Sequence, residues 1–121
     1  MHKALLLIAH GSRRASSNQE IIDLAQKIAS ATSEFDHVKG CFLEMAEPSI
    51  NAAIDELVEQ KIEHICVLPY FLAAGRHVIE DVPEFIDKAA AQHPLVKFEL
   101  ISYFGSSENI VSSILTHALD K

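Results

Sequence analysis

The stretch KALLLIA at residues 3–9 decides the fold class of this 121-residue chain. It is a short and almost continuous apolar run, which is typical of a strand buried on both faces of a sheet. Three more runs share this character, namely VKGCFL at 38–43, HICVLPY at 64–70 and VKFELI at 96–101. We therefore expect four buried strands.

The segments between and after these runs carry apolar residues three or four positions apart, which is the spacing of amphipathic helices. These positions are Ile21, Leu24, Ala25 and Ile28; Ile50, Ala53, Ile54 and Leu57; Val82, Phe85, Ile86 and Ala89; and Ile110, Ile114, Leu115 and Ala118. The last helix is expected to follow an N-cap region at Ser106 and Ser107. Strands and helices therefore alternate along the whole chain.

Strict alternation with right-handed crossovers produces an all-parallel sheet covered by helices on both faces. We predict a single domain over residues 1–121, an α/β fold built as a three-layer αβα sandwich around a four-stranded parallel sheet. The doubly wound strand order 2-1-3-4 puts a switch point between the first and third strands. Ligands of such sheets bind there, beyond the carboxyl ends of the strands.

Composition and charge exclude some classes of partner and indicate where the protein acts. Ten basic residues against 17 acidic ones give a net charge of −7, which argues against a nucleic-acid or anionic-membrane surface. The first apolar run, from Ala4 to Ala9, is too short for a signal peptide or a membrane span, so we expect a cytoplasmic protein. Cys41 and Cys66 lie in apolar runs without a CxxC pair, and we expect both to be reduced and buried.

Histidines follow the two strands that flank the predicted switch point. His10 and Gly11 come after the first strand, Gly75 and His77 after the third, and Glu44 after the second. A glycine beside each histidine allows a sharp turn or the close approach of a ligand, which favours a binding site. The alternatives are that His10 caps the strand end, that His77 is a surface residue, and that Glu44 is a solvated loop carboxylate.

The remaining basic and histidine residues are assigned to the surface. Arg13, Arg14 and Arg76 share the loops of the two histidines, so they are either solvated or form a locally positive rim. Five further histidines have no partner at metal-ligand spacing in the sequence, and we expect them at the surface: His2, His37, His64, His93 and His117. The sequence also lacks the motifs GxxxxGK[ST], GxGxxG, GxSxG and HExxH, so the chemistry falls to two histidines and a carboxylate.

Three motifs in a fixed order carry a resemblance to a known family. LLLIAHGSRR at 5–14, FLEMAEPSI at 42–50 and VLPYFLAAGRHVIEDVP at 67–83 resemble the short form of the CbiX family, the class II sirohydrochlorin chelatases. The resemblance implies a chelatase-like fold that inserts Co²⁺, Fe²⁺ or Ni²⁺ into sirohydrochlorin with no cofactor besides that metal. It also implies a homodimer with the active cleft between subunits.

The resemblance assigns roles to individual residues. His10 and His77 match the two active-site histidines, which would also bind the metal, and Glu44 matches the acidic residue that assists them. From their positions in the loops of the two histidines, we expect contacts with the tetrapyrrole from Arg13, Arg76, Phe71, Leu72, Ala73 and Gly75. The alternative for Phe71, Leu72 and Ala73 is ordinary packing beneath the loop. The tail lacks the proline that commonly follows the glycine after the last strand, a departure confined to that loop.

The residue types suit this chemistry independently of the resemblance. Insertion displaces two pyrrole protons, and histidine supplies both a base that works near neutral pH and a ligand that releases the ion. At physiological salt, electrostatic interactions are screened over about 8 Å. Nearby arginines, rather than the net charge of the protein, should therefore determine how a carboxylate-rich macrocycle binds. One alternative is phosphoryl transfer through His10, but that chemistry normally requires an arginine directly before the histidine, and Ala9 occupies this position. The other alternative is a carrier that binds a metal or a tetrapyrrole without catalysis.

Overall fold

The structure is a computed structural model that describes residues 2–120 apart from the side chain of His77. The strands are β1 (Lys3–Ala9), β2 (His37–Phe42), β3 (His64–Pro69) and β4 (Lys97–Leu100). The helices are α1 (Ala15–Ala31), α2 (Ile50–Glu59), α3 (Val82–Gln92) and α4 (Ile110–Leu119). A π-helical turn over His77–Asp81 leads into α3, and a 3-10 turn over Phe104–Ser106 follows β4.

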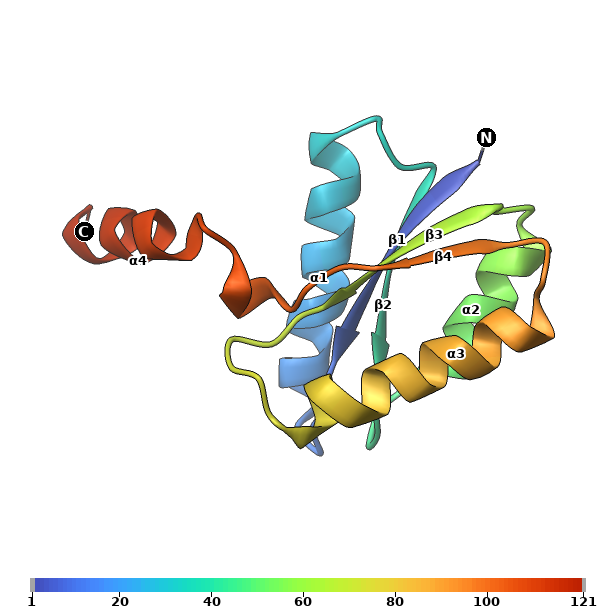
Figure 1. Ribbon diagram of the computed structural model, residues 1–121. Helices are drawn as coiled ribbons and strands as arrows, with labels where there is room; N and C mark the ends of the chain where they lie inside the picture. Colours follow the sequence, from blue (N-terminus) through green and yellow to red (C-terminus); the bar gives the residue numbers. More distant parts are fainter. Residues whose placement is uncertain (1, 121) are drawn as a thin grey trace.

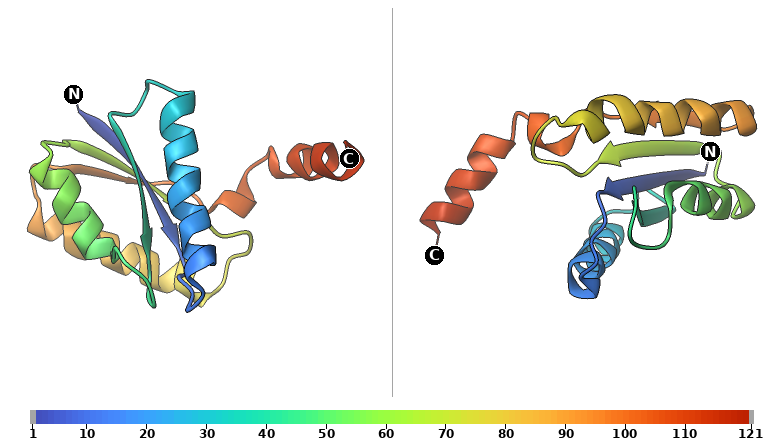
Figure 2. Two further views of the ribbon diagram at one scale, coloured as in Figure 1. Left: turned by 180° about the vertical axis from the view of Figure 1, so that it is seen from behind. Right: turned by 90° about the horizontal axis from the view of Figure 1, so that it is seen from below.

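The four strands form one parallel sheet in the order β2-β1-β3-β4, which confirms the predicted fold and the switch point between β1 and β3. Leu5 of β1 pairs with Val38 on one side and with Cys66 on the other. Helix α1 lies on one face, while α2 and α3 share the other (Figure 1, Figure 2). The chain therefore has the three predicted layers.

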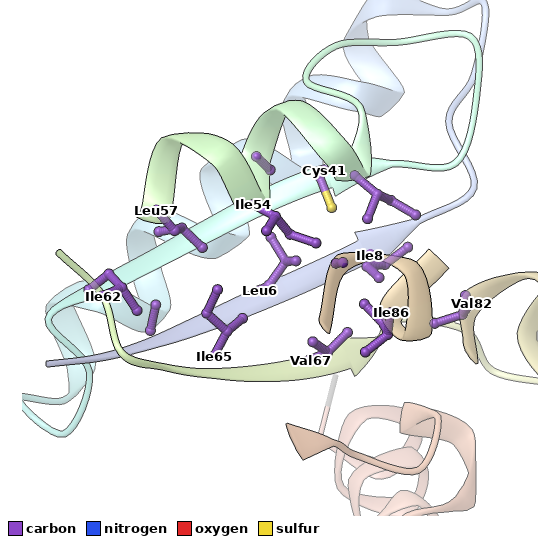
Figure 3. Packing of buried hydrophobic residues seen from close by; sticks show 14 residues of the cluster. Leu6, Ile8, Cys41, Ile54, Leu57, Ile62, Ile65, Val67, Val82 and Ile86 are labelled. Atoms are coloured by element: carbon purple, nitrogen blue, oxygen red, sulfur yellow. The ribbon is translucent and has the colours of Figure 1, made fainter. Parts of the chain in front are cut away.

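Alternate residues of β1 pack into two separate clusters, because successive side chains of a strand point to opposite faces. Leu6 and Ile8 lie in the larger cluster, against α2 and α3 (Figure 3). Leu5 and Leu7 lie in the smaller one, against α1. This two-sided burial explains why the run at residues 3–9 is apolar almost throughout.

Both cysteines are buried and not joined in a disulfide, as predicted. Cys41 belongs to the larger cluster and Cys66 to the smaller one. Burial raises the pKa of the Cys41 thiol to about 12, so this side chain behaves as a small apolar residue.

Helix α4 differs from the expectation in its start and in its packing. It begins at Ile110 after Asn109, rather than directly after Ser106 and Ser107, because a turn over Glu108 and Asn109 precedes it. Figures 1 and 2 show that it projects away from the sheet, and its apolar residues Val111, Ile114, Leu115 and Leu119 are exposed. Across the described residues, every helix is too short or too polar to cross a bilayer.

The prediction that His64 lies at the surface is wrong. It opens β3, an inner strand flanked by β1 and β4, and it is only 9% exposed. The histidine also has partners that the sequence analysis did not identify, since its Nε2 lies 2.9 Å from Glu99 Oε1 and 3.7 Å from Cys66 Sγ. The other exception is His93, which is half-buried beside Asp55, whereas His2, His37 and His117 are exposed as predicted.

Candidate active site

The side chains of His10 and Glu44 meet at the carboxyl edge of the sheet. His10 Nε2 lies 2.9 Å from Glu44 Oε2, at hydrogen-bond distance. His10 directly follows β1 and Glu44 comes two residues after β2, and these neighbouring parallel strands end at the same edge. Two residues that the sequence singled out separately are therefore one interacting pair.

The backbone holds this pair in register. The Leu43 N–H donates to the Ala9 carbonyl at 3.0 Å, and the Glu44 N–H donates to the His10 carbonyl at 3.1 Å. The hydrogen bonding between β1 and β2 thus continues beyond both strands. Because each side chain starts from fixed backbone, little reorganisation is needed to bring the two groups together.

Gly11 is required where β1 turns into the following loop. Its φ is +97°, a conformation that residues with a Cβ rarely adopt, and an added Cβ would lie 1.8 Å from the Glu44 carbonyl oxygen. The sequence predicted a sharp turn or the close approach of a ligand at this glycine. The turn is present, and the group that approaches closely is the backbone of the neighbouring loop.

Asn18 anchors the loop after β1, and the sequence analysis did not identify it. The Ser12 N–H donates to Asn18 Oδ1 at 2.9 Å, and Asn18 Nδ2 donates to the Ser12 carbonyl at 2.8 Å. An amide in the first turn of a helix is a usable signal, since such side chains bond to nearby backbone. Asn18 therefore ties the segment after His10 to α1.

The loop after β3 contributes exposed apolar residues to the same edge. The Tyr70 N–H donates to the Ile8 carbonyl at 2.8 Å, which fixes the start of this loop beside β1. Phe71 packs partly against the main core, whereas Leu72, at 73% exposure, and Ala73 and Gly75 are open to solvent. Of the residues expected to contact a tetrapyrrole, Phe71 is thus the one least available.

The loop after β4 supports the loop after β3 and was also missed. The Gly105 N–H donates to the Phe71 carbonyl at 2.9 Å, and an added Cβ on Gly105 would lie 1.8 Å from the Leu72 carbonyl oxygen. The rings of Tyr70 and Phe104 pack with centroids 5.8 Å apart. A glycine just after the last strand is the signal that could have indicated this close approach.

His77 opens the π-helical turn that precedes α3. The N–H groups of Val78 and Ile79 both donate to the Gly75 carbonyl at 3.1 Å, so the turn is anchored at this glycine. Short π-helical segments occur frequently at functional sites. The side chain of His77 lies outside the described residues, and its pairing with His10 stays a prediction.

The arginines around the edge are exposed rather than buried in ion pairs. Arg13 and Arg14 lie in the loop after β1, and Arg14 directly precedes α1. Arg76 Nε lies 3.7 Å from Glu80 Oε2, an ion pair whose arginine side chain is 83% exposed and whose energetic contribution is therefore small. Whether these residues act as a positive rim stays a prediction.

The pair of His10 and Glu44 has the chemistry of a metal-handling and proton-handling site. A carboxylate hydrogen-bonded to one ring nitrogen fixes the orientation of an imidazole. Imidazole is a suitable ligand for Co²⁺, Fe²⁺ and Ni²⁺, and a carboxylate oxygen can add a further ligand. The His10 side chain is 45% exposed and that of Glu44 is 49% exposed, so the edge is open to a large partner.

Comparison with known sequences identifies a family that this chain resembles over most of its length. The sequence model of the CbiX family matches residues 4–120. A sirohydrochlorin ferrochelatase of Bacillus subtilis (strain 168) is 30% identical over 118 residues, covering 94% of this chain and 43% of that protein. A sirohydrochlorin cobaltochelatase of Methanocaldococcus jannaschii is 34% identical over 91 residues, covering 75% of this chain and 63% of that protein. The chain thus spans about half the length of these relatives.

Solved structures show the same fold. A CbiX protein of cobalamin biosynthesis from Marinobacter aquaeolei VT8 matches with a TM-score of 0.79 and 28% identity, over 98% of this chain and 98% of that one. The sirohydrochlorin chelatase SirB from Bacillus subtilis subspecies spizizenii, in complex with cobalt, matches with a TM-score of 0.86 and 29% identity. That match covers 99% of this chain and 51% of the SirB chain.

Proposed function

The chain belongs to the CbiX family, and from this membership and the pair of His10 and Glu44 we propose that it inserts a divalent metal ion into sirohydrochlorin. The metal is Co²⁺, Fe²⁺ or Ni²⁺. The observation that carries the proposal is the 2.9 Å contact between His10 and Glu44 at the carboxyl edge of the sheet. The relatives named as ferrochelatase and cobaltochelatase, and a SirB structure that holds cobalt, support the choice of metal and substrate.

His10 takes two tasks in this proposal. Its neutral imidazole holds the incoming ion loosely and then accepts a proton that the macrocycle loses as the metal enters. Glu44 keeps the ring oriented through its 2.9 Å hydrogen bond and stabilises the imidazolium that forms. If His10 and His77 are the two protein ligands, most coordination positions of the ion remain for pyrrole nitrogens and water. The ion can then pass from the protein to the macrocycle.

His77 and the arginines complete the proposed site. His77 supplies the second imidazole, in line with the matching histidine of the family, and its backbone begins a turn beyond the neighbouring strand β3. Arg13 and Arg76 bind carboxylates of the macrocycle, and they are exposed and therefore able to do so. Leu72, Ala73 and Gly75 contact its apolar surface.

Replacing Glu44 with glutamine tests the assisting role. The variant should lose less insertion activity than a variant without His10, because water can partly replace an orienting carboxylate. The rate of Co²⁺ insertion is measured by absorbance between pH 6 and 9 for both variants and the wild type. An unchanged rate and pH profile in Glu44→Gln would make Glu44 an ordinary solvated carboxylate. Glu47→Gln, a change at an exposed carboxylate three residues along the same loop, is the matched control.

A homodimer is part of the proposal. Small-molecule sites bury 70 to 90% of a ligand, whereas the two side chains of the pair are each about half exposed in one subunit. A second copy facing the same edge supplies the missing wall, and a self-complementary two-fold contact is the commonest arrangement. Leu72, Ile114 and Leu115 are exposed apolar residues, and such residues often mark the surface where another subunit binds.

Sedimentation at micromolar concentration should therefore give twice the mass of one chain. Mixing His10→Ala subunits with His77→Ala subunits should restore part of the activity, because a site shared between subunits regains both histidines in some mixed dimers. A protein that remains monomeric while turning over substrate at the full rate would contradict the shared cleft. A dimer whose mixed form regains no activity would place both histidines of a site in one subunit.

A further inference from the structure

A histidine, a cysteine and a glutamate gather on one face of the sheet, away from the carboxyl edge. His64 Nε2 lies 2.9 Å from Glu99 Oε1 and 3.7 Å from Cys66 Sγ, and one ligand atom from each residue lies within 4.8 Å of the other two. Cys66 is two residues beyond His64 on β3, and it pairs with Glu99 in the register of β3 and β4. Sheet backbone therefore fixes all three positions.

From this cluster we propose a second metal site, in which His64, Cys66 and Glu99 hold one divalent ion of the zinc or cobalt class. Thiolate, imidazole and carboxylate are all ligands of these ions. The fourth tetrahedral position remains for water. The site goes beyond the chelatase function and does not depend on it.

The two distances from His64 Nε2 are close to those that tetrahedral coordination requires. Bond lengths of about 2.05 Å to nitrogen, 2.3 Å to sulfur and 2.1 Å to oxygen require ligand separations of about 3.6 Å for nitrogen and sulfur and about 3.4 Å for nitrogen and oxygen. The observed separation of nitrogen and sulfur is 3.7 Å, already close to the requirement. The carboxylate at 2.9 Å must retreat slightly. It can do so because the Glu99 side chain is 52% exposed.

Burial and charge also fit a built site. His64 and Cys66 are buried, while the exposed carboxylate of Glu99 leaves a path from solvent to the ligand atoms. Burial raises the pKa of the Cys66 thiol, and the negative charge of Glu99 acts in the same direction. The positive charges of Lys3 and Lys97 act in the opposite direction and favour the thiolate.

This site is separate from the active site proposed above. His64 is the first residue of β3 and Pro69 is the last, and five steps along a strand span roughly 17 Å. An ion at His64 is therefore too far from the carboxyl edge to share ligands with His10. The ligand types differ as well, because His10 and Glu44 supply no sulfur.

Sulfur coordination is the readout that tests the proposal. Titrating the His10→Ala variant with Co²⁺ should produce the near-ultraviolet charge-transfer band of a bond between Co²⁺ and a thiolate, saturating at one ion per chain. The band should vanish when Cys66→Ala is added and persist when Cys41→Ala is added. Cys41 is the matched control because it is also buried, but its neighbours form the main apolar cluster.

A second variant keeps the test decisive if Cys66→Ala fails to fold. Glu99→Gln changes a half-exposed side chain, and it should weaken Co²⁺ binding by about tenfold or more while the thiolate band is still reached at saturation. Equilibrium dialysis with Zn²⁺ measures the same loss without relying on colour. The proposal is overturned if the parent variant shows no thiolate band, if the band survives Cys66→Ala, or if Glu99→Gln binds both ions as tightly as its parent.

Discussion

Replacing His10 with alanine should lower kcat/KM for metal insertion by about tenfold or more, because the change removes both the proposed ligand and the proposed base. His77→Ala should have an effect of similar size. The fold should be unaffected by His10→Ala, since the side chain lies in a loop at the surface and is about half exposed. Steady-state insertion rates and a thermal melt of each variant provide the comparison.

The matched control for this prediction is His37→Ala. His37 is also an exposed histidine at a strand end, but it opens β2 and so lies at the opposite edge of the sheet. Its replacement should leave the insertion rate within about twofold of the wild type, as expected for a surface change without partners at the site. Equal rates in the wild type and His10→Ala at neutral pH would remove His10 from the mechanism.

Replacing Gly11 with alanine should be the most destabilising change at the candidate active site. The new Cβ would lie 1.8 Å from the Glu44 carbonyl oxygen, and the residue would have to keep a φ of +97° or move the loop. Strain and displacement of this kind cost about 3 kcal/mol in the free energy of unfolding, which lowers the Tm of a domain of this size by about 10 °C. Insertion activity should fall as well, because Glu44 and His10 would lose their common frame.

Gly75→Ala is the control for the effect on stability. Among the described residues, and apart from its two chain neighbours, nothing lies within 4 Å of a Cβ built on Gly75. Its Tm should therefore change by no more than about 2 °C, as expected for a surface substitution. If the two variants melt at the same temperature, the backbone of Glu44 does not restrict the position of Gly11.

The sheet could be predicted from the sequence because its pattern is local. Each strand is an apolar run, each crossover is an amphipathic segment, and the handedness of crossovers leaves few orders of the strands. The strand order then places His10 and Glu44 at one edge, since parallel strands end together. The four strands, their order and the helices α1, α2 and α3 were therefore predicted correctly.

The rest depends on contacts between distant residues. The 2.9 Å distance between His10 and Glu44 follows from hydrogen bonds across two loops, and the need for Gly11 follows from the backbone of the second loop. His64 looked like a surface histidine because its partner Glu99 is 35 positions away in the sequence. Helix α4 carries the pattern of a covered helix, yet the turn at Phe104–Ser106 directs it away from the sheet.

Turnover is the measurement that tests the proposed function most directly. Sirohydrochlorin in large excess over enzyme is mixed with Co²⁺, Fe²⁺ or Ni²⁺, and the metallated macrocycle is measured by its absorbance. The rate without protein is subtracted. We expect many equivalents of product per active site with at least one of these ions. Product that stops at one equivalent per site, or a rate no faster than that without protein, would contradict a chelatase and favour a carrier.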